Sequence, residues 1–143
     1  MFFGLSGMHS RADMLRAVME GVAYSQRDCL DVFRQMNVPF SQMTATGGGG
    51  RSPFWRQMMA DVLDCPITTV SNNEGAALGA AILAGVGAGV YESVPAACDL
   101  ILRTNKPQLP DRSMKAAYDN IHAIYREVYG NLKETFKTLS GIS

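Results

Sequence analysis

Two short segments of the chain have the composition of β-strands, and a helical segment follows each of them. Residues 41–46 read SQMTAT and residues 66–70 read PITTV, so β-branched residues mark both. Alternating strands and helices predict an α/β layer architecture that is helix-rich with few strands. Since two strands make a poor sheet by themselves, we expect the chain to belong to a larger protein or to need a partner that completes its sheet.

Apolar periodicity predicts a long first helix over residues 10–36. Ser10 and Asp13 form a weak capping-box signal at its start, and the segment from Asn37 to Pro39 ends it. The apolar stripe of this helix consists of Leu15, Val18, Met19, Val22, Leu30, Phe33 and Met36.

Further helices follow the two strand segments. Ser52 is a favoured N-cap before Pro53, which predicts a helix over residues 53–64. Ser71 and Glu74 form a capping box before an alanine- and glycine-rich helix that stops near residues 85–89. Three prolines predict a connecting region over residues 90–110, and a last helix is predicted over residues 111–137. Its apolar seam consists of Met114, Ala117, Tyr118, Ile121, Ile124, Tyr125, Val128, Leu132 and Phe136.

Charge and cysteine content exclude several classes of protein. The 13 Lys and Arg residues balance 13 Asp and Glu, which gives no reason to expect nucleic acid or an acidic membrane as a partner. Residues 75–91 carry no charge, but glycine and alanine dominate them, so we predict a buried helix rather than a membrane span.

The three cysteines lie far apart, which predicts reduced thiols in a cytoplasmic protein. The N-terminus lacks the pattern of a signal peptide.

No residue pattern identifies a catalytic group or a metal site. His9 and His122 lack the spacing of metal ligands, and we expect surface or structural roles for both. Asp61 and Asp64 lie three residues apart on one predicted helix, and we interpret them as helix-surface charges.

Four consecutive glycines, Gly47 to Gly50, lie between the first strand segment and the helix capped by Ser52. They are either a mobile linker or a loop that contacts a ligand. The sequence lacks the lysine of a phosphate-binding P-loop, and Ser52 breaks a G-x-G-x-x-G pattern. Strand–glycine–helix junctions bring backbone N–H groups close to a ligand, which favours nucleotide binding. Arg51 is interpreted equally well as a phosphate contact or as a solvated charge.

Three motifs in order resemble the C-terminal domain of FGGY-family carbohydrate kinases, and within that family most of all the xylulokinases. They are DMLRAVME at residues 13–20, TGGGGRSPFWRQMMADVLDCPI at residues 46–67, and EGAALGAAILAGVGAG at residues 74–89. The resemblance covers nearly the whole chain and is weakest after Tyr91. It implies that residues 1–143 are an incomplete nucleotide-binding C-terminal domain, the C-terminal part of a ribonuclease H-like (actin-like ATPase) domain.

The resemblance also implies a ligand and a division of roles among the glycines. The chain would bind the adenosine part of ATP, with Gly48 and Gly49 against the adenine and Ser52 bounding the pocket. Gly47 and Gly50 would hold the turn. The small residues Gly75, Ala76 and Gly79 would let their helix pack close beneath the nucleotide.

Other family motifs are not found in these 143 residues, among them the phosphate motifs, the catalytic aspartate and the main sugar contacts. We therefore assign no catalytic residue and no Mg²⁺ ligand, and we expect no kinase activity from this chain alone. In the intact enzyme ATP would phosphorylate D-xylulose to D-xylulose 5-phosphate, with the sugar bound through the missing domain. The alternatives are a kinase for another pentulose or polyol, or a non-catalytic interaction module, and a homo-oligomer is left open.

Overall fold

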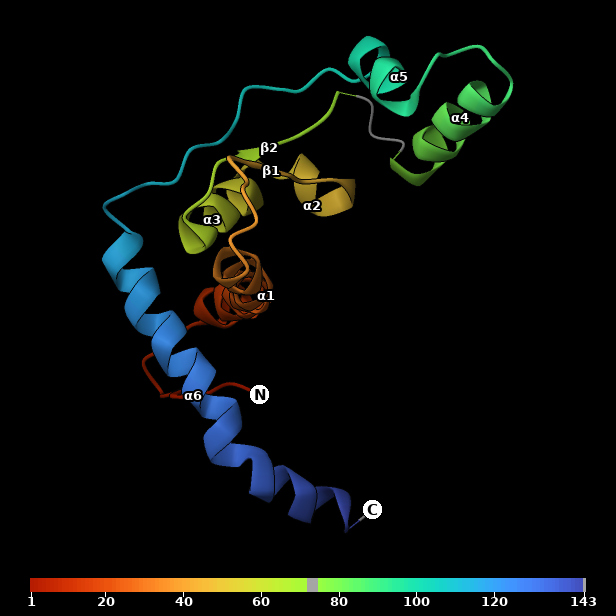
Figure 1. The fold of residues 1–143 in the computed structure, drawn as a ribbon. Helices are drawn as coiled ribbons and strands as arrows, with labels where there is room; N and C mark the ends of the chain where they lie inside the picture. The colour runs from red at the N-terminus through yellow and green to blue at the C-terminus, as the bar shows by residue number, and fades with distance from the viewer. Residues whose placement is uncertain (72–74, 143) are drawn as a thin grey trace. The chain divides into compact units, whose positions relative to one another are not determined.

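The structure, a computed structural model, describes residues 1–71 and 75–142. It divides into two compact units. The first unit comprises Met1–Pro39, Asp61–Asp64 and Pro110–Ser143, and the second comprises Phe40–Ala60 and Cys65–Leu109. The predicted architecture is confirmed, because helices dominate and only two short strands are present among the described residues (Figure 1).

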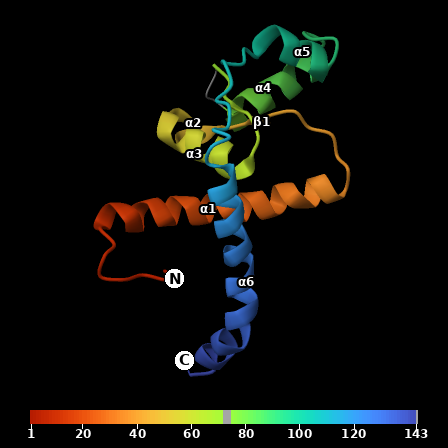
Figure 2. The same cartoon turned by 90° about the vertical axis from the view of Figure 1, so that its left-hand side faces the viewer.

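Two long helices make up most of the first unit. They are α1 (Arg11–Gln35) and α6 (Lys115–Ser140), which contact each other. Helix α1 is seen end-on beside α6 in Figure 1, and the two helices cross in Figure 2. The predicted capping box at the start of α1 is confirmed, since the Ser10 backbone N–H donates to the Asp13 carboxylate at 2.8 Å and the Asp13 N–H donates to Ser10 Oγ.

Helix α1 ends where Asn37 adopts a left-handed conformation with φ of 55°. The Val38 N–H then donates to the Phe33 carbonyl at 3.0 Å, and the Asn37 N–H donates to the Arg34 carbonyl at 3.1 Å. These two hydrogen bonds form a Schellman motif, in which asparagine sometimes takes the place of glycine. The predicted end of the first helix is therefore correct.

Aromatic rings fill the contact between α1 and α6. The ring of Tyr24 stacks against His122 with centroids 5.7 Å apart and meets the edge of Tyr118 at 6.4 Å. All three side chains are buried. Burial disfavours the charged phenolate, so it raises the pKa of both tyrosine hydroxyls. His122 thus has the structural role that the sequence predicted, within the packing of the first unit.

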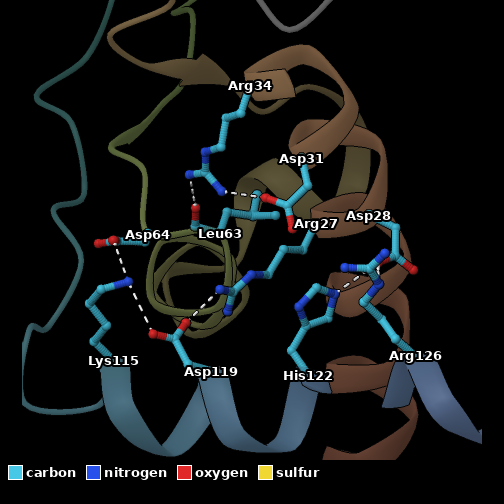
Figure 3. A network of polar contacts seen from close by, with 10 residues as sticks. All are labelled: Arg27, Asp28, Asp31, Arg34, Leu63, Asp64, Lys115, Asp119, His122 and Arg126. Atoms are coloured by element: carbon cyan, nitrogen blue, oxygen red, sulfur yellow. Dashed lines mark hydrogen bonds and ion pairs between the residues drawn. The ribbon is translucent and has the colours of Figure 1, made fainter. Parts of the chain in front are cut away.

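Charged side chains of α1 and α6 form a network of polar contacts in the same unit, which includes His122 (Figure 3). Arg27 donates to Asp119, whose other oxygen lies 3.2 Å from the Lys115 ammonium. Lys115 also pairs with Asp64 at 2.8 Å. At another point of the network, His122 Nε2 lies 2.9 Å from an Asp28 carboxylate oxygen.

Asp61 and Asp64 are therefore not the simple surface charges that the sequence suggested. Asp61 is buried and accepts a hydrogen bond from the Asp111 backbone N–H at 2.7 Å. Asp64, with a left-handed φ of 47°, pairs with Lys115, while Arg34 donates to the neighbouring Leu63 carbonyl at 2.7 Å. Both carboxylates therefore bind residues of the first unit, to which residues 61–64 also belong.

We expect Asp119→Asn to lower the free energy of unfolding at pH 7 by about 1–2 kcal/mol, because the Arg27 side chain, only 11% exposed, would lose its carboxylate. Hydrogen bonding from Arg27 lowers the pKa of Asp119. The ionised carboxylate therefore stabilises the fold above its unfolded pKa of about 3.9, and this contribution is lost as the pH falls through the lower folded-state value. Denaturant titrations from neutral to acidic pH should show the two proteins converging at low pH.

Asp99→Asn is the control, because Asp99 is an exposed carboxylate outside this network. It should leave the free energy of unfolding unchanged within about 0.5 kcal/mol. If the free energies of unfolding of the wild type and of Asp119→Asn differed by the same amount at all pH values, the ionised carboxylate would not be the stabilising group.

The predicted apolar stripe of α1 is mostly exposed in this structure. Leu30 is buried, whereas Leu15, Val18 and Met36 are more than half exposed. In α6, Ile124 is also more than half exposed and Ile121 is 46% exposed. An apolar hollow of about 1140 Å³ lies in the first unit beside several of these residues, among them Val18, Val22, Ile121 and Ile124. Helical periodicity predicted which residues share a face but not whether this chain covers that face.

The second unit is built on a parallel pair of strands, β1 (Met43–Thr44) and β2 (Ile67–Thr68). Both were predicted. Met43 pairs with Ile67 and Thr44 with Thr68, and the Ala45 N–H donates to the Thr68 carbonyl at 2.8 Å. Helix α2 (Gly47–Arg51) and helix α3 (Pro53–Leu63) connect the two strands. Thr68 and Ile67 are fully buried, which places the core of this unit at β2.

An extended segment pairs with the other edge of β2. Ile67 exchanges two backbone hydrogen bonds with Gln108, at 2.9 and 2.7 Å, in an antiparallel bridge. Val70 forms a second antiparallel bridge with Thr104. Part of the region predicted as a simple connection therefore extends the small sheet.

Helices α4 (Gly75–Gly87) and α5 (Val94–Ile101) lie side by side after β2 (Figure 1). The prediction of a connecting region at residues 90–110 was wrong over α5, where Ser93 Oγ caps the helix by accepting from the Ala96 N–H at 3.3 Å. Pro95 lies in the first turn, a position that tolerates proline. The capping box of Ser71 with Glu74 includes residues outside those described.

Helix α4 confirms the predicted alanine- and glycine-rich helix, but its burial differs from the prediction. Ile82 is its one buried residue among those described, and Leu83 is 63% exposed. Tyr91 lies over Gly85, where an added Cβ would meet the ring at 2.6 Å. No helix in the described part of the chain has both the length and the apolar character that crossing a membrane requires.

Candidate functional site

The four glycines form a turn of helix rather than an irregular loop. Helix α2 begins at Gly47, whose φ of +71° is a conformation that glycine adopts without strain. Thr46 precedes it in an extended conformation and makes no side-chain cap. The segment is therefore not an irregular linker in this structure, because the glycines have helical backbone geometry between β1 and α3.

Ser52 joins α2 to α3. Its N–H donates to the Gly49 carbonyl at 3.2 Å, and its hydroxyl accepts from the Trp55 N–H at 3.3 Å. This side-chain bond is the N-cap that the sequence predicted, with Pro53 as the first helical residue. Ser52 thus orients the first turn of α3 next to the glycines.

The glycines differ in what surrounds them. A Cβ added to Gly50 would lie 2.9 Å from the Ala45 carbonyl oxygen, so this backbone packs directly on the residue after β1. A Cβ on Gly49 would meet the Trp55 indole at 2.9 Å. In contrast, a Cβ on Gly48 has no atom within 4 Å, so this position faces open space in the described part of the chain.

A polar hollow of about 340 Å³ lies beside the glycine turn. Ala45 follows β1 directly and Thr69 follows β2, so the hollow lies at the carboxyl ends of the two parallel strands. Ligands of open α/β sheets bind in this position. The hollow is lined by Ala45, Gly50, Arg51, Arg56, Thr69, Val70, Ser71, Asn105 and Lys106.

Gly50 is the one predicted site residue that lines this hollow, while Gly47, Gly48, Gly49 and Ser52 lie in the adjoining turn. Sequence reasoning considered Arg51 but missed the other polar residues. The polar run after β2 could have indicated Thr69 and Ser71, because strand ends carry ligand contacts. No sequence signal indicated Asn105 and Lys106, since the antiparallel bridge between Val70 and Thr104 brings their segment to β2.

Hydrogen bonds hold the wall of the hollow in place. Asn105 donates its backbone N–H to the Thr69 carbonyl and its amide to Thr69 Oγ1, both at 2.8 Å. The Asn105 carbonyl accepts from Thr68 Oγ1 at 2.7 Å. Across the hollow, Arg56 Nη1 donates to the Gly50 carbonyl at 2.6 Å, which joins α3 to the glycine turn. These hydrogen bonds link the strand end, the glycine turn and α3 around the hollow.

Metal binding finds no support in the residues that the structure describes. No group of three His, Cys, Asp or Glu side chains lies there in an arrangement that could hold a metal ion. His9 is exposed and bonds to Ser6, while His122 belongs to the aromatic packing of the first unit.

The small residues Gly75 and Gly79, which the family resemblance placed beneath the nucleotide, have open space where a Cβ would project. They lie in the first two turns of α4, a helix that packs against α5. Their proposed approach to a nucleotide stays a prediction.

Comparison with known families gives one match, which covers more than half of the chain. The model of the "FGGY family of carbohydrate kinases, C-terminal domain" matches residues 1–88. These residues include α1, the glycine turn, both strands and α4.

Individual relatives and solved structures agree with that match. A xylulose kinase of Staphylococcus epidermidis is 32% identical over 133 residues, which cover 93% of this chain and 27% of that protein. A gluconokinase of Bacillus licheniformis is 36% identical over 115 residues, or 80% of this chain and 22% of that protein. The crystal structure of a xylulose kinase from Rhodospirillum rubrum superposes with a TM-score of 0.82 at 31% identity, covering 96% of this chain and 28% of that one.

The chain therefore spans about a quarter of the length of these relatives. Its helices and strands are arranged as in the xylulose kinase structure, so the prediction of the C-terminal part of a ribonuclease H-like, actin-like ATPase domain is confirmed. The match at residues 1–88 and this structural likeness show that the chain belongs to the FGGY family of carbohydrate kinases.

Proposed function

We propose that this chain is the nucleotide-binding portion of an ATP-dependent sugar kinase. The observation that carries the proposal is the glycine turn beside a polar hollow at the carboxyl ends of β1 and β2. Gly48 offers an open surface without a side chain, which suits the flat face of an adenine. In this proposal Ser52, whose hydroxyl accepts a hydrogen bond from the Trp55 N–H, would bound the adenine surface.

The complete kinase would transfer the terminal phosphoryl group of ATP to D-xylulose and form D-xylulose 5-phosphate. Xylulose kinases among the relatives support this substrate. In this proposal residues 1–143 supply one incomplete domain, and a separate domain supplies the sugar contacts and the catalytic base. ATP brings Mg²⁺, which neutralises phosphate charge in such reactions, and we assign none of its ligands to the described residues.

A kinase for a different sugar is the second candidate. The gluconokinase of Bacillus licheniformis has the higher identity of the two relatives compared, 36% against 32%, although over a shorter stretch. Shared residues of a nucleotide-binding portion do not select the sugar, because selectivity depends on the groups that contact the sugar itself. Turnover assays of the full-length enzyme with D-xylulose and gluconate would decide between them.

Gly48→Val tests the nucleotide site. We expect it to weaken binding of ADP to the 143-residue chain at least tenfold in isothermal titration calorimetry, because a branched side chain would occupy the open surface that the adenine needs. Gly48 is a better test position than Gly49, where valine would collide with the Trp55 indole and disturb the fold.

Gly7→Val is the matched control, since Gly7 also has no atom within 4 Å of an added Cβ and lies in the first unit. It should bind ADP as the wild type does. Unchanged ADP affinity in a folded Gly48→Val variant would refute the proposed position of the adenine.

A further inference from the structure

The polar hollow gathers positive charge in a chain whose net charge is zero. Arg51, Arg56 and Lys106 all line it, and none of its described lining residues is acidic. They come from three separate segments, namely the glycine turn, α3 and the loop before Gln108. Clefts lined by one sign of charge concentrate ligands of the opposite sign.

The neutral lining residues add hydrogen-bond donors to this charge. Thr69 and Ser71 contribute hydroxyl groups where β2 ends. Asn105, held to Thr69 by the hydrogen bonds described above, fixes the backbone immediately before Lys106. Arg56 is oriented by its bond to the Gly50 carbonyl. Cations on a preorganised wall lose less entropy when they bind a ligand than freely moving side chains do.

We propose that this hollow binds a phosphate group, with Lys106, Arg51 and Arg56 as its cationic contacts. Arginine and lysine next to hydroxyl and amide donors are the groups that recognise phosphate oxygens. The volume of about 340 Å³ is near the lower end of ligand pockets, which suits a phosphate or diphosphate better than a whole nucleotide.

The phosphate has two sources with the same chemistry, the phosphate tail of the bound nucleotide and a separate phosphate ester or phosphate ion. The first source rests on the proposed function, whereas the second does not. Competition between ADP and pyrophosphate distinguishes them. If ADP displaces pyrophosphate, the nucleotide tail is the occupant, and if both bind together, the hollow holds a second phosphate ligand beside the nucleotide.

The test is calorimetric titration of the 143-residue chain with pyrophosphate at low salt. We expect Lys106→Gln to weaken pyrophosphate binding roughly tenfold or more, because a charge-assisted hydrogen bond is lost. Lys106 is exposed, so its replacement should not disturb the fold. Lys133→Gln is the matched control, since Lys133 is an exposed lysine of the first unit, and it should bind pyrophosphate as the wild type does.

Arg51→Gln gives an independent second variant and should weaken binding similarly. Pyrophosphate that fails to bind the wild type, or that binds wild type, Lys106→Gln and Arg51→Gln equally, would overturn the phosphate site. Titration with adenosine tests the proposed nucleotide site separately from the phosphate site. If adenosine binds and Gly48→Val abolishes that binding, but pyrophosphate does not bind, the nucleotide site stands and the phosphate site is rejected. If pyrophosphate binds but adenosine does not, the phosphate site stands and the nucleotide site is rejected.

Discussion

Leu63→Ala is expected to lower the free energy of unfolding by about 2–5 kcal/mol. Leu63 is the last residue of α3 and its side chain is completely buried. Its carbonyl accepts a hydrogen bond from Arg34, and Asp64 next to it pairs with Lys115, so the backbone cannot collapse easily into the space left by the deleted atoms. The lost apolar burial and the remaining cavity therefore both destabilise the fold.

Urea denaturation followed by circular dichroism measures this loss. Leu83→Ala is the matched control, because Leu83 also lies in a helix but its side chain is 63% exposed. It should change the free energy of unfolding by no more than about 0.5 kcal/mol. Similar losses for the two variants would show that the burial of Leu63 does not hold in solution.

Gly50→Ala is expected to destabilise the second unit by about 1–3 kcal/mol. The added Cβ would lie 2.9 Å from the Ala45 carbonyl oxygen and 3.1 Å from its carbon. Both atoms belong to backbone that follows β1, and the Ala45 N–H is already bonded to the Thr68 carbonyl. Since the backbone cannot rotate away as a side chain does, the helix-favouring effect of alanine does not offset the collision.

Gly48→Ala makes the same chemical change two residues earlier, but it should not lower the free energy of unfolding. Its Cβ meets no atom within 4 Å, so alanine should be neutral or should stabilise α2 by up to about 1 kcal/mol. Thermal and urea unfolding of the two variants compare them directly. If Gly50→Ala proved as stable as Gly48→Ala, the close packing of the glycine turn on Ala45 would be incorrect.

Local signals predicted most of the helices and both strands correctly. Ser10 with Asp13, and Ser52 before Pro53, indicated helix starts because these side chains bond to N–H groups only a few residues away. The end of the first helix at Asn37 followed from an equally local feature. Such interactions depend on residues adjacent in sequence, so they are visible without knowledge of the fold.

Other features were not predicted, some because a local signal was misread and others because they depend on residues that are distant in sequence. Helix α5 was missed because prolines suggested a loop, although Pro95 in a first turn costs a helix little. The exposure of Leu15 and Val18 was missed because periodicity identifies a face without identifying what covers it. The charged lining of the polar hollow was largely missed because its residues come from three segments.

By itself, the sequence determined the α/β class, the family resemblance and the position of the glycine turn, since these follow from residue types in consecutive positions. Only the tertiary structure decided that the glycines are helical, that Gly50 packs on Ala45 and that Gly48 is open. It alone placed Lys106 beside Arg51 and Arg56 in one hollow. The reason is physical. Antiparallel bridges join Ile67 to Gln108 and Val70 to Thr104, residues that are 41 and 34 positions apart. Such long-range pairing leaves no periodic pattern in the sequence.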